Sequence, residues 1–210
     1  MPQAMHNELQ EVTMPDDQRH PARRHHFLAA WVRSPFKIGG LLPSSRALAR
    51  AMAVGVDVKK PGAVIELGAG TGVVTHALLQ AGIAPGRLVV IERDEKLHAI
   101  MSSQFPHLNI LCADAITLDT VLAGAGVTKI NSIVSSLPLL SMPKAVRQAI
   151  EHQMATLIGH DGCIVQFTYG PTSPISAQQM HKYHLHGRRM KLVMANIPPA
   201  HVWVYRKSET

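Results

Sequence analysis

A glycine-rich stretch directly follows an apolar run and contains the residues best suited to bind a small charged molecule. The order is Val64-Ile65-Glu66-Leu67-Gly68-Ala69-Gly70-Thr71-Gly72, in which the apolar run predicts a strand and the residues beyond it a helix. Gly68 permits a tight turn, while Gly70 and Gly72 leave room for a ligand to approach the backbone. The stretch therefore predicts a nucleotide-binding type of loop between a strand and a helix.

Two acids follow the next apolar runs, at positions suited to the nucleoside part of such a ligand. Glu92 ends the second run, twenty residues after Gly72, and its carboxylate can accept hydrogen bonds from both ribose hydroxyls. Asp114 follows the third run, where it can accept a hydrogen bond from an adenine amino group. An ordinary glycine turn with surface acids is the alternative, which the order and spacing disfavour. We therefore predict a cofactor site containing both acids and their neighbours Arg93 and Ala115.

The glycine spacing and a nearby acid distinguish between two kinds of nucleotide cofactor. The spacing is G-x-G-x-G, whereas dinucleotide folds favour G-x-G-x-x-G with a pyrophosphate at the helix N-terminus. Glu66 lies two residues before the first glycine, where a carboxylate would repel a pyrophosphate. A carboxylate suits a cofactor with cationic ends, and S-adenosylmethionine has a sulfonium and an ammonium group. We predict S-adenosylmethionine rather than NAD, with Glu66 and Ala69 in its site.

The stretch from Ala63 to Arg206 resembles the class I methyltransferases, because the glycine loop, Glu92 and Asp114 follow one another as in that class. The resemblance implies an α/β, Rossmann-like fold. Its sheet would have seven mostly parallel strands with helices on both faces and an antiparallel last strand. The resemblance also implies that the three glycines lie at the methionine portion of the cofactor, Glu92 at the ribose and Asp114 near the adenine.

Two further stretches are similar to the bacterial phospholipid N-methyltransferases, which convert phosphatidylethanolamine toward phosphatidylcholine. One is Phe27–Ser45, with Trp31, Ser34-Pro35 and Gly40-Leu-Leu-Pro-Ser-Ser45. The other is the loop Ser135-Ser-Leu-Pro-Leu-Leu140, after the fourth apolar run. This similarity implies an enzyme that N-methylates phosphatidylethanolamine and its methylated derivatives at a membrane surface.

The loop after the fourth apolar run is the predicted place for the acceptor amine. Methyl transfer from a sulfonium is an in-line displacement, so the protein has to align donor carbon and nucleophile. Backbone carbonyls of the loop and the hydroxyls of Ser135 and Ser136 could hold an amine beside Leu137. We also expect Ser135 to border the cofactor. The loop has no carboxylate to take the amine's proton. Tyr169 and the pair His25-His26 are candidates by position, against the simpler alternative of a packing or surface role.

The same loop bears on two alternative functions. Adenine dimethyltransferases of ribosomal RNA use an Asn-x-Pro-aromatic loop whose ring stacks on the extruded base. Here Leu139 follows Pro138, and aromatic residues make up 4% of the chain, which disfavours an RNA enzyme. The other alternative is a non-catalytic membrane-binding protein with a retained cofactor fold, and the intact glycines and acids argue against it.

Thirteen histidines raise the question of a metal site. His181, His184 and His186 lie close together in the sequence, but no carboxylate or thiolate accompanies them. Such a trio is a weak ligand set, so we predict no metal.

Short apolar runs and helical patterns alternate from Ala63 onward and must position these residues. The expected strands are Ala63–Leu67, Leu88–Ile91, Asn109–Cys112, Ile133–Ser135 and Cys163–Tyr169, with a hairpin of Met190–Ala195 and Val202–Tyr205 closing the sheet edge. The expected helices are His25–Arg33, one capped by Ser44 and ending near Val54, and Lys144–Ile158. The expected apolar face of the last helix contains Val146, Ala149, Ile150, Met154 and Leu157. Alternating strands and helices predict a parallel sheet covered on both faces.

The chain has 210 residues, of which 46% are hydrophobic, enough for one substantial core. We expect a flexible tail over 1–20, a basic amphipathic helical extension over 21–60 and the methyltransferase domain over 61–210. No apolar run reaches the roughly 18–20 residues that cross a bilayer. The first eighteen residues are too acidic for a secretion signal, and two cysteines are too few for a disulfide scaffold. The sequence thus predicts a soluble, cytoplasmic protein.

The formal net charge of +7 indicates an anionic partner. The segment from Arg19 to Arg50 contains seven basic residues and no acid, together with Phe27, Leu28 and Trp31. We expect it to contact an anionic membrane surface and the phospholipid substrate, which places the protein peripherally on the inner membrane surface. A lid over the cofactor is the alternative for its apolar residues. We expect no DNA partner, and RNA is disfavoured.

Overall fold

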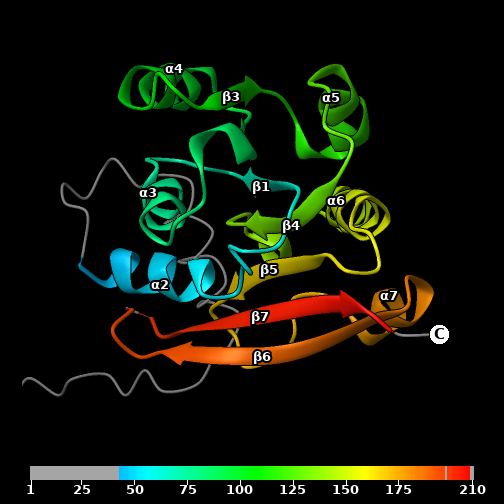
Figure 1. Cartoon of the computed structure of the whole chain (residues 1–210). Coiled ribbons are helices and arrows are strands. Elements are labelled where there is room, and N and C mark those ends of the chain that lie inside the picture. The colour runs from blue at the N-terminus through cyan, green and yellow to red at the C-terminus, as the bar shows by residue number, and fades with distance from the viewer. Residues whose placement is uncertain (1–42, 197, 209–210) are drawn as a thin grey trace, which may run out of the picture. The chain divides into compact units, whose positions relative to one another are not determined.

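The computed structural model describes residues 43–196 and 198–208, with side chains from Arg46 onward (Figure 1). The helix predicted at His25–Arg33 and most of the basic segment 19–50 lie outside this description. The prediction that Ser44 caps the next helix is wrong, because that helix, α2, spans Pro43–Ala53 and Ser44 is its second residue. Within the described ranges, no helix is long and apolar enough to cross a membrane.

Seven strands form one sheet in the order β3-β2-β1-β4-β5-β7-β6 (Figure 1). They are β1 Ala63–Leu67, β2 Leu88–Glu92, β3 Asn109–Cys112, β4 Ile130–Ser135, β5 Cys163–Thr168, β6 Leu185–Val193 and β7 Ala200–Lys207. Strands β1 to β5 pair in parallel, while β7 is antiparallel to both of its neighbours. The predicted mostly parallel sheet with an antiparallel last strand is confirmed, as is the hairpin at its edge.

The order of the strands creates a switch point beside β1. From β1 the chain adds β2 and β3 on one side, then crosses to add β4 and β5 on the other. Open α/β sheets bind ligands at such a point, outside the carboxyl ends of the strands. The register pairs Leu67 with Ser135, the last residues of β1 and β4. The glycine loop and the Ser135–Leu140 loop therefore leave the sheet side by side.

Helices cover both faces of the sheet, as the alternation predicted. They are α2 Pro43–Ala53, α3 Val73–Gln80, α4 Glu95–Gln104, α5 Leu118–Gly124, α6 Lys144–Leu157 and α7 Ala177–Lys182, with short 3-10 turns η2 Pro85–Arg87, η3 Ala115–Thr117 and η4 Leu139–Ser141. One core contains Met52 of α2, Leu78 of α3 and Met101 of α4. The other contains Leu122 of α5 and Met154 of α6.

Helix α6 confirms the predicted helix at Lys144–Ile158, but its buried face is rotated from the expected one. Val146 is exposed, and Ala149 and Leu157 are only half-buried. The buried positions of the helix and its C-cap are Ile150, Glu151, Met154, Ala155 and Ile158. Glu151 can occupy the core because its Oε1 lies 3.7 Å from Nε of Arg147, one turn earlier.

Strand β6 starts earlier than predicted, at Leu185 rather than Met190. Its first half lacks an apolar pattern because β6 is the last strand of the sheet and most of its side chains are exposed. A register shift between Arg189 and Lys191 leaves Met190 as a bulge opposite β7. Strand β7 is also longer than the predicted Val202–Tyr205.

Helix α2 lies within the segment expected as the basic extension, 21–60, and it has two contrasting faces. Leu48, Ala49 and Met52 are buried in the same core as Val165 of β5. Arg46 and Arg50 are exposed, so the opposite face of the helix is basic.

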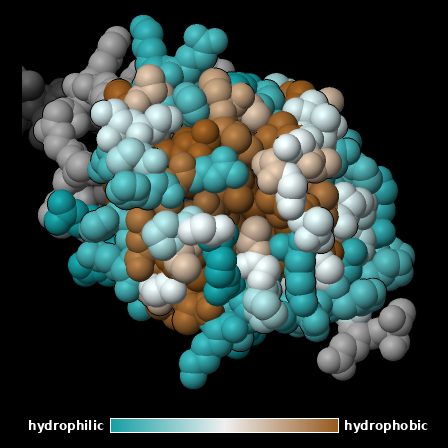
Figure 2. Space-filling view, turned by 45° about the horizontal axis from the view of Figure 1, so that its top comes forward, coloured by the Kyte–Doolittle hydropathy of each residue, from teal (hydrophilic) through white to brown (hydrophobic). Residues whose placement is uncertain are grey.

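Apolar surface also gathers on the outside of the molecule. Figure 2 shows one face where it lies near the middle within a border of polar residues. The exposed large apolar side chains of the described residues are Val54, Ile100, Ile116, Leu140, Val146, Leu192 and Met194. Single exposed apolar side chains are ordinary, whereas a gathered patch offers packing to another molecule or segment.

Candidate functional site

The glycine loop between β1 and α3 is shaped by three residues with positive φ: Gly68 at 72°, Gly70 at 57° and Gly72 at 80°. A Cβ on Gly68 would lie 2.7 Å from Cδ2 of Leu137, and one on Gly72 would lie 2.8 Å from Sδ of Met101. These side-chain ends could shift for a new Cβ, so the positive φ is the stronger reason for glycine at both positions. No atom of the described residues lies within 4 Å of the corresponding point at Gly70, so they leave this backbone open to a ligand.

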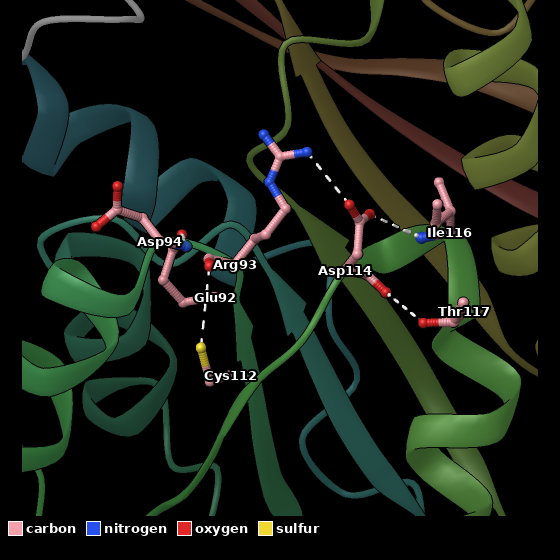
Figure 3. Close-up of polar contacts among 7 residues, drawn as sticks. All are labelled: Glu92, Arg93, Asp94, Cys112, Asp114, Ile116 and Thr117. Carbon is pink, nitrogen blue, oxygen red and sulfur yellow. Dashed lines mark hydrogen bonds and ion pairs between the residues drawn. The ribbon is translucent and has the colours of Figure 1, made fainter.

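Glu92, which Figure 3 shows beside Arg93 and Asp94, is the last residue of β2 and connects the glycine loop to the end of this strand. Its Oε2 accepts a hydrogen bond from the N–H of Gly70 at 2.9 Å, and its Oε1 accepts one from the N–H of Asp94 at 2.9 Å. Only 8% of the residue is exposed. Each oxygen keeps a second acceptor position, so the carboxylate is fixed in place and can still accept two ribose hydroxyls.

Asp114 and Arg93 form the next part of the same edge (Figure 3). Nη1 of Arg93 lies 3.2 Å from Oδ2 of Asp114, and Oδ1 of Asp114 accepts a hydrogen bond from the N–H of Ile116. Asp114 thereby caps η3, whose first residue, Ala115, is buried. The Arg93 side chain is 77% exposed, so this ion pair is exchangeable and leaves Asp114 accessible to an adenine amino group.

Glu66 is a fully buried carboxyl group at the end of β1. Its Oε2 accepts a hydrogen bond from Oγ1 of Thr75 at 2.7 Å, while Oε1 has no partner among the described residues. Burial raises the pKa of Glu66 to about 7, although the Thr75 hydrogen bonds oppose this shift. A buried acceptor with a free oxygen fits a cationic ligand group. It fits the phosphates of a dinucleotide poorly.

The loop after β4 is tied directly to the strand that leads into the glycines. The N–H of Ser136 donates to the carbonyl of Leu67 at 2.9 Å, and Oγ of Ser135 accepts from the N–H of Leu137 at 3.3 Å. Ser135 is fully buried, and Oγ of Ser136 is buried without a partner among the described residues. The structure thus brings the predicted acceptor loop against the predicted cofactor loop, with Leu137 packed on Gly68.

Gln166 of β5 is a supporting residue that the sequence interpretation missed. It is fully buried, and its Nε2 donates to the carbonyls of Leu137 and Phe167, each at 2.9 Å. The side chain therefore holds the backbone of the acceptor loop from the neighbouring strand. The available signal was one polar residue inside the apolar run Cys163–Phe167, since a buried amide needs specific partners.

Tyr169 follows the end of β5 and contacts Phe167 edge-on, with ring centroids 5.3 Å apart. Burial raises the pKa of Tyr169 to about 12, and a hydrogen bond with Asn196 opposes the shift. The phenol is therefore protonated at neutral pH and can donate a hydrogen bond, whereas it cannot serve as a base there. The pair His25-His26 lies outside the described residues. Within the described ranges, no three His, Cys, Asp or Glu side chains gather as metal ligands.

Comparisons with known proteins agree with this geometry. The chain matches no protein-family model. The ornithine lipid N-methyltransferase of Singulisphaera acidiphila is 25% identical over 183 residues, which cover 86% of this chain and 94% of that protein. The ribosomal RNA small subunit methyltransferase A of Phenylobacterium zucineum is 36% identical over 78 residues, but these cover 36% of this chain and 26% of that protein.

Solved structures share the fold over most of their length. The N-methyltransferase NodS of Bradyrhizobium japonicum superposes with a TM-score of 0.62 at 13% identity, covering 89% of this chain and 98% of that one. The 1,6-didemethyltoxoflavin-N1-methyltransferase of Burkholderia thailandensis superposes with a TM-score of 0.60 at 16% identity, covering 94% of each chain. Both structures contain S-adenosylhomocysteine.

The fold, the loop with its acids and the end-to-end sequence likeness lead to one class. This chain is a class I S-adenosylmethionine-dependent methyltransferase. The open backbone at Gly70, the fixed carboxylate of Glu92 and the unpartnered oxygen of Glu66 fit S-adenosylmethionine as its cofactor.

Proposed function

We propose that this protein N-methylates the headgroup amine of a membrane lipid, and that its main substrates are phosphatidylethanolamine and its methylated derivatives. The carrying observation is the likeness to an ornithine lipid N-methyltransferase along nearly the whole of both chains. Phosphatidylethanolamine and ornithine lipids both present an amine at a membrane surface. The similarity of the Ser135–Leu140 loop to phospholipid N-methyltransferases favours the former.

The acceptor loop has groups suited to hold an amine. When bound, S-adenosylmethionine supplies an electrophilic methyl group that the lone pair of an amine can attack in line. The buried, unpartnered Oγ of Ser136 can accept an N–H of the substrate, and the Leu137 carbonyl, fixed by Gln166, can accept another. Tyr169 is protonated at neutral pH and cannot take the ammonium proton, which has to leave to another base or to water before attack.

The basic segment 19–50 would bring the protein to its substrate. Its described part supports this role, because Arg46 and Arg50 are exposed on α2 while the other face of the helix is buried. Cationic side chains near an anionic bilayer favour peripheral binding. We therefore propose a cytoplasmic protein that associates with the inner membrane surface through this segment.

A methyl-transfer assay with labelled S-adenosylmethionine tests the proposal. Vesicles containing phosphatidylethanolamine, vesicles containing ornithine lipid, and ribosomal RNA are offered in parallel to the purified protein. We expect label in the phosphatidylethanolamine headgroup, and much less label with Glu92→Ala when S-adenosylmethionine is kept near the Kd of the wild type. Label only in ornithine lipid would correct the headgroup. No label in either lipid, with S-adenosylmethionine bound, would instead support a non-catalytic membrane-binding protein.

Methylation of ribosomal RNA is the second candidate, favoured by the 36% identity to a ribosomal RNA methyltransferase over a short stretch. The structure weighs against it at the acceptor loop. Leu139, which follows Pro138, is 1% exposed and belongs to the core, so it offers no surface on which a base could stack. Label in RNA and none in lipid would establish this candidate.

A further inference from the structure

The C-terminal quarter of the protein, like the basic segment 19–50, contains a run of sequence with basic residues and no acidic ones. Residues 162–208 contain no aspartate or glutamate. They contain six lysines and arginines: Lys182, Arg188, Arg189, Lys191, Arg206 and Lys207. Five of these belong to the β6–β7 hairpin. The methyl-transfer site uses none of them.

The hairpin exposes its charges along the β6 edge of the described sheet. Strand β6 is the last in the sheet, and Arg188, Arg189 and Lys191 are exposed on it. Across the strands, Arg188 pairs with Val204 and Arg189 with Trp203, and the bulge then aligns Lys191 with Val202. Cross-strand partners share a face, so these cations extend to both faces of the edge.

The turn of the hairpin is apolar and lies at the functional edge of the sheet. Because β7 is antiparallel to both β5 and β6, β6 runs in the same direction as β1 and β4 and ends at the same, carboxyl edge. Leu192 and Met194, at that end, are 44% and 68% exposed. Asn196 of the turn is buried and hydrogen-bonds with Tyr169, which joins the turn to the end of β5.

We propose that the β6–β7 hairpin is a second membrane-docking surface, which binds anionic phospholipid headgroups through Arg188, Arg189 and Lys191. Leu192 and Met194 insert beside them at the acyl boundary. Cations flanking exposed aliphatic side chains match such a bilayer surface. A single-stranded nucleic acid would instead be bound by exposed aromatic rings. This inference rests on the proposed function for its purpose, which is to turn the carboxyl edge of the sheet toward the bilayer.

Vesicle flotation tests the surface without requiring methyl transfer. The full chain is mixed with phosphatidylcholine vesicles, with and without phosphatidylglycerol, at low and high salt. The variant Arg188→Glu/Arg189→Glu/Lys191→Glu is compared with Lys59→Glu/Lys129→Glu/Lys182→Glu, which makes the same change of net charge at exposed lysines that precede β1, β4 and β6, at the opposite edge of the sheet. We expect the hairpin variant to lose about a hundredfold in partitioning to anionic vesicles, and the control variant far less. Met194→Ser should also weaken binding, and this loss should persist at high salt because Met194 contributes an apolar contact rather than a charge.

The outcomes separate the hairpin from the proposed reaction. Both triple variants must bind S-adenosylmethionine as the wild type does, which shows that they are folded. Equal flotation of the hairpin variant and the wild type would overturn the inference, since Arg188, Arg189 and Lys191 would then only guard an edge strand against pairing. Retention on RNA but not on vesicles would overturn it as well. Loss of flotation in the hairpin variant supports the inference even if no lipid is methylated, and that result refutes only the proposed reaction.

Discussion

S-adenosylmethionine should bind this protein with release of a proton from Glu66. The carboxyl group is fully buried, hydrogen-bonded to Thr75 through one oxygen and unpartnered at the other, and burial raises its pKa to about 7. A cationic cofactor group beside the free oxygen would favour the carboxylate. With a pKa of 7, about nine-tenths of the free protein is protonated at pH 6. The affinity should therefore rise about tenfold per pH unit up to pH 7 and level off above it.

The size of the effect has a limit set by the ordinary pKa of glutamate. If binding returns the pKa of Glu66 from about 7 to its ordinary 4.5, the affinity gained is worth about 3 kcal/mol, a few hundredfold at most. Calorimetry at pH 6 in two buffers of different ionisation enthalpy counts the released protons. Glu66→Gln should release none and should show a flat pH profile. Proton release that persists in this variant, or a wild-type affinity that stays constant from pH 5.5 to 7.5, would refute the reasoning.

The stability of the cofactor-free protein provides a control, because it should fall with rising pH while the cofactor affinity rises. The folded state raises the pKa of Glu66 above its unfolded value, so protonation stabilises the fold fully below about pH 4.5. That contribution is lost as the pH rises to about 7. The Tm of the wild type relative to that of Glu66→Gln should fall as the pH rises across this window. Saturating S-adenosylmethionine should remove this pH dependence.

Five further substitutions probe the remaining parts of the site. Gly72→Ala should lower the free energy of unfolding in urea by about 2–4 kcal/mol, because the residue has a positive φ and the new Cβ meets Met101. Gly70→Ala should lower it by about 1 kcal/mol and should mainly weaken cofactor binding. Glu92→Ala should lower the affinity for S-adenosylmethionine about ten- to a hundredfold by calorimetry, and unchanged affinity would remove Glu92 from the site. Gln166→Leu should lower kcat while the calorimetric affinity for the cofactor stays unchanged, since it frees the acceptor loop; equal losses in both would indicate a general folding defect. Tyr169→Phe should leave the pH dependence of kcat unchanged between pH 6 and 9, because a phenol with a pKa of about 12 does not titrate there.

The features that the sequence predicted well depend on local rules. Gly68, Gly70 and Gly72 follow an apolar run, and their positive φ angles are those that glycine adopts without strain. Strands that alternate with helices must run in parallel, so all their carboxyl ends meet at one edge of the sheet. This rule alone collects the ends of β1, β2 and β4, and with them Glu92 and Ser135, in one place. Neither inference requires knowledge of how side chains pack.

Several other features depend on contacts between distant residues, which periodicity does not encode. Helix α6 buries Glu151 and exposes Val146, because the sheet and α5 select its inner face and Arg147 offsets the buried charge. Gln166 became a site residue only when β5 paired with β4 and placed its amide at the Leu137 carbonyl. The raised pKa of Glu66 likewise follows from burial, a property of the assembled core. The sequence thus determined which groups reach the carboxyl edge, and the tertiary structure decided their partners and protonation, because both depend on neighbours far apart in the chain.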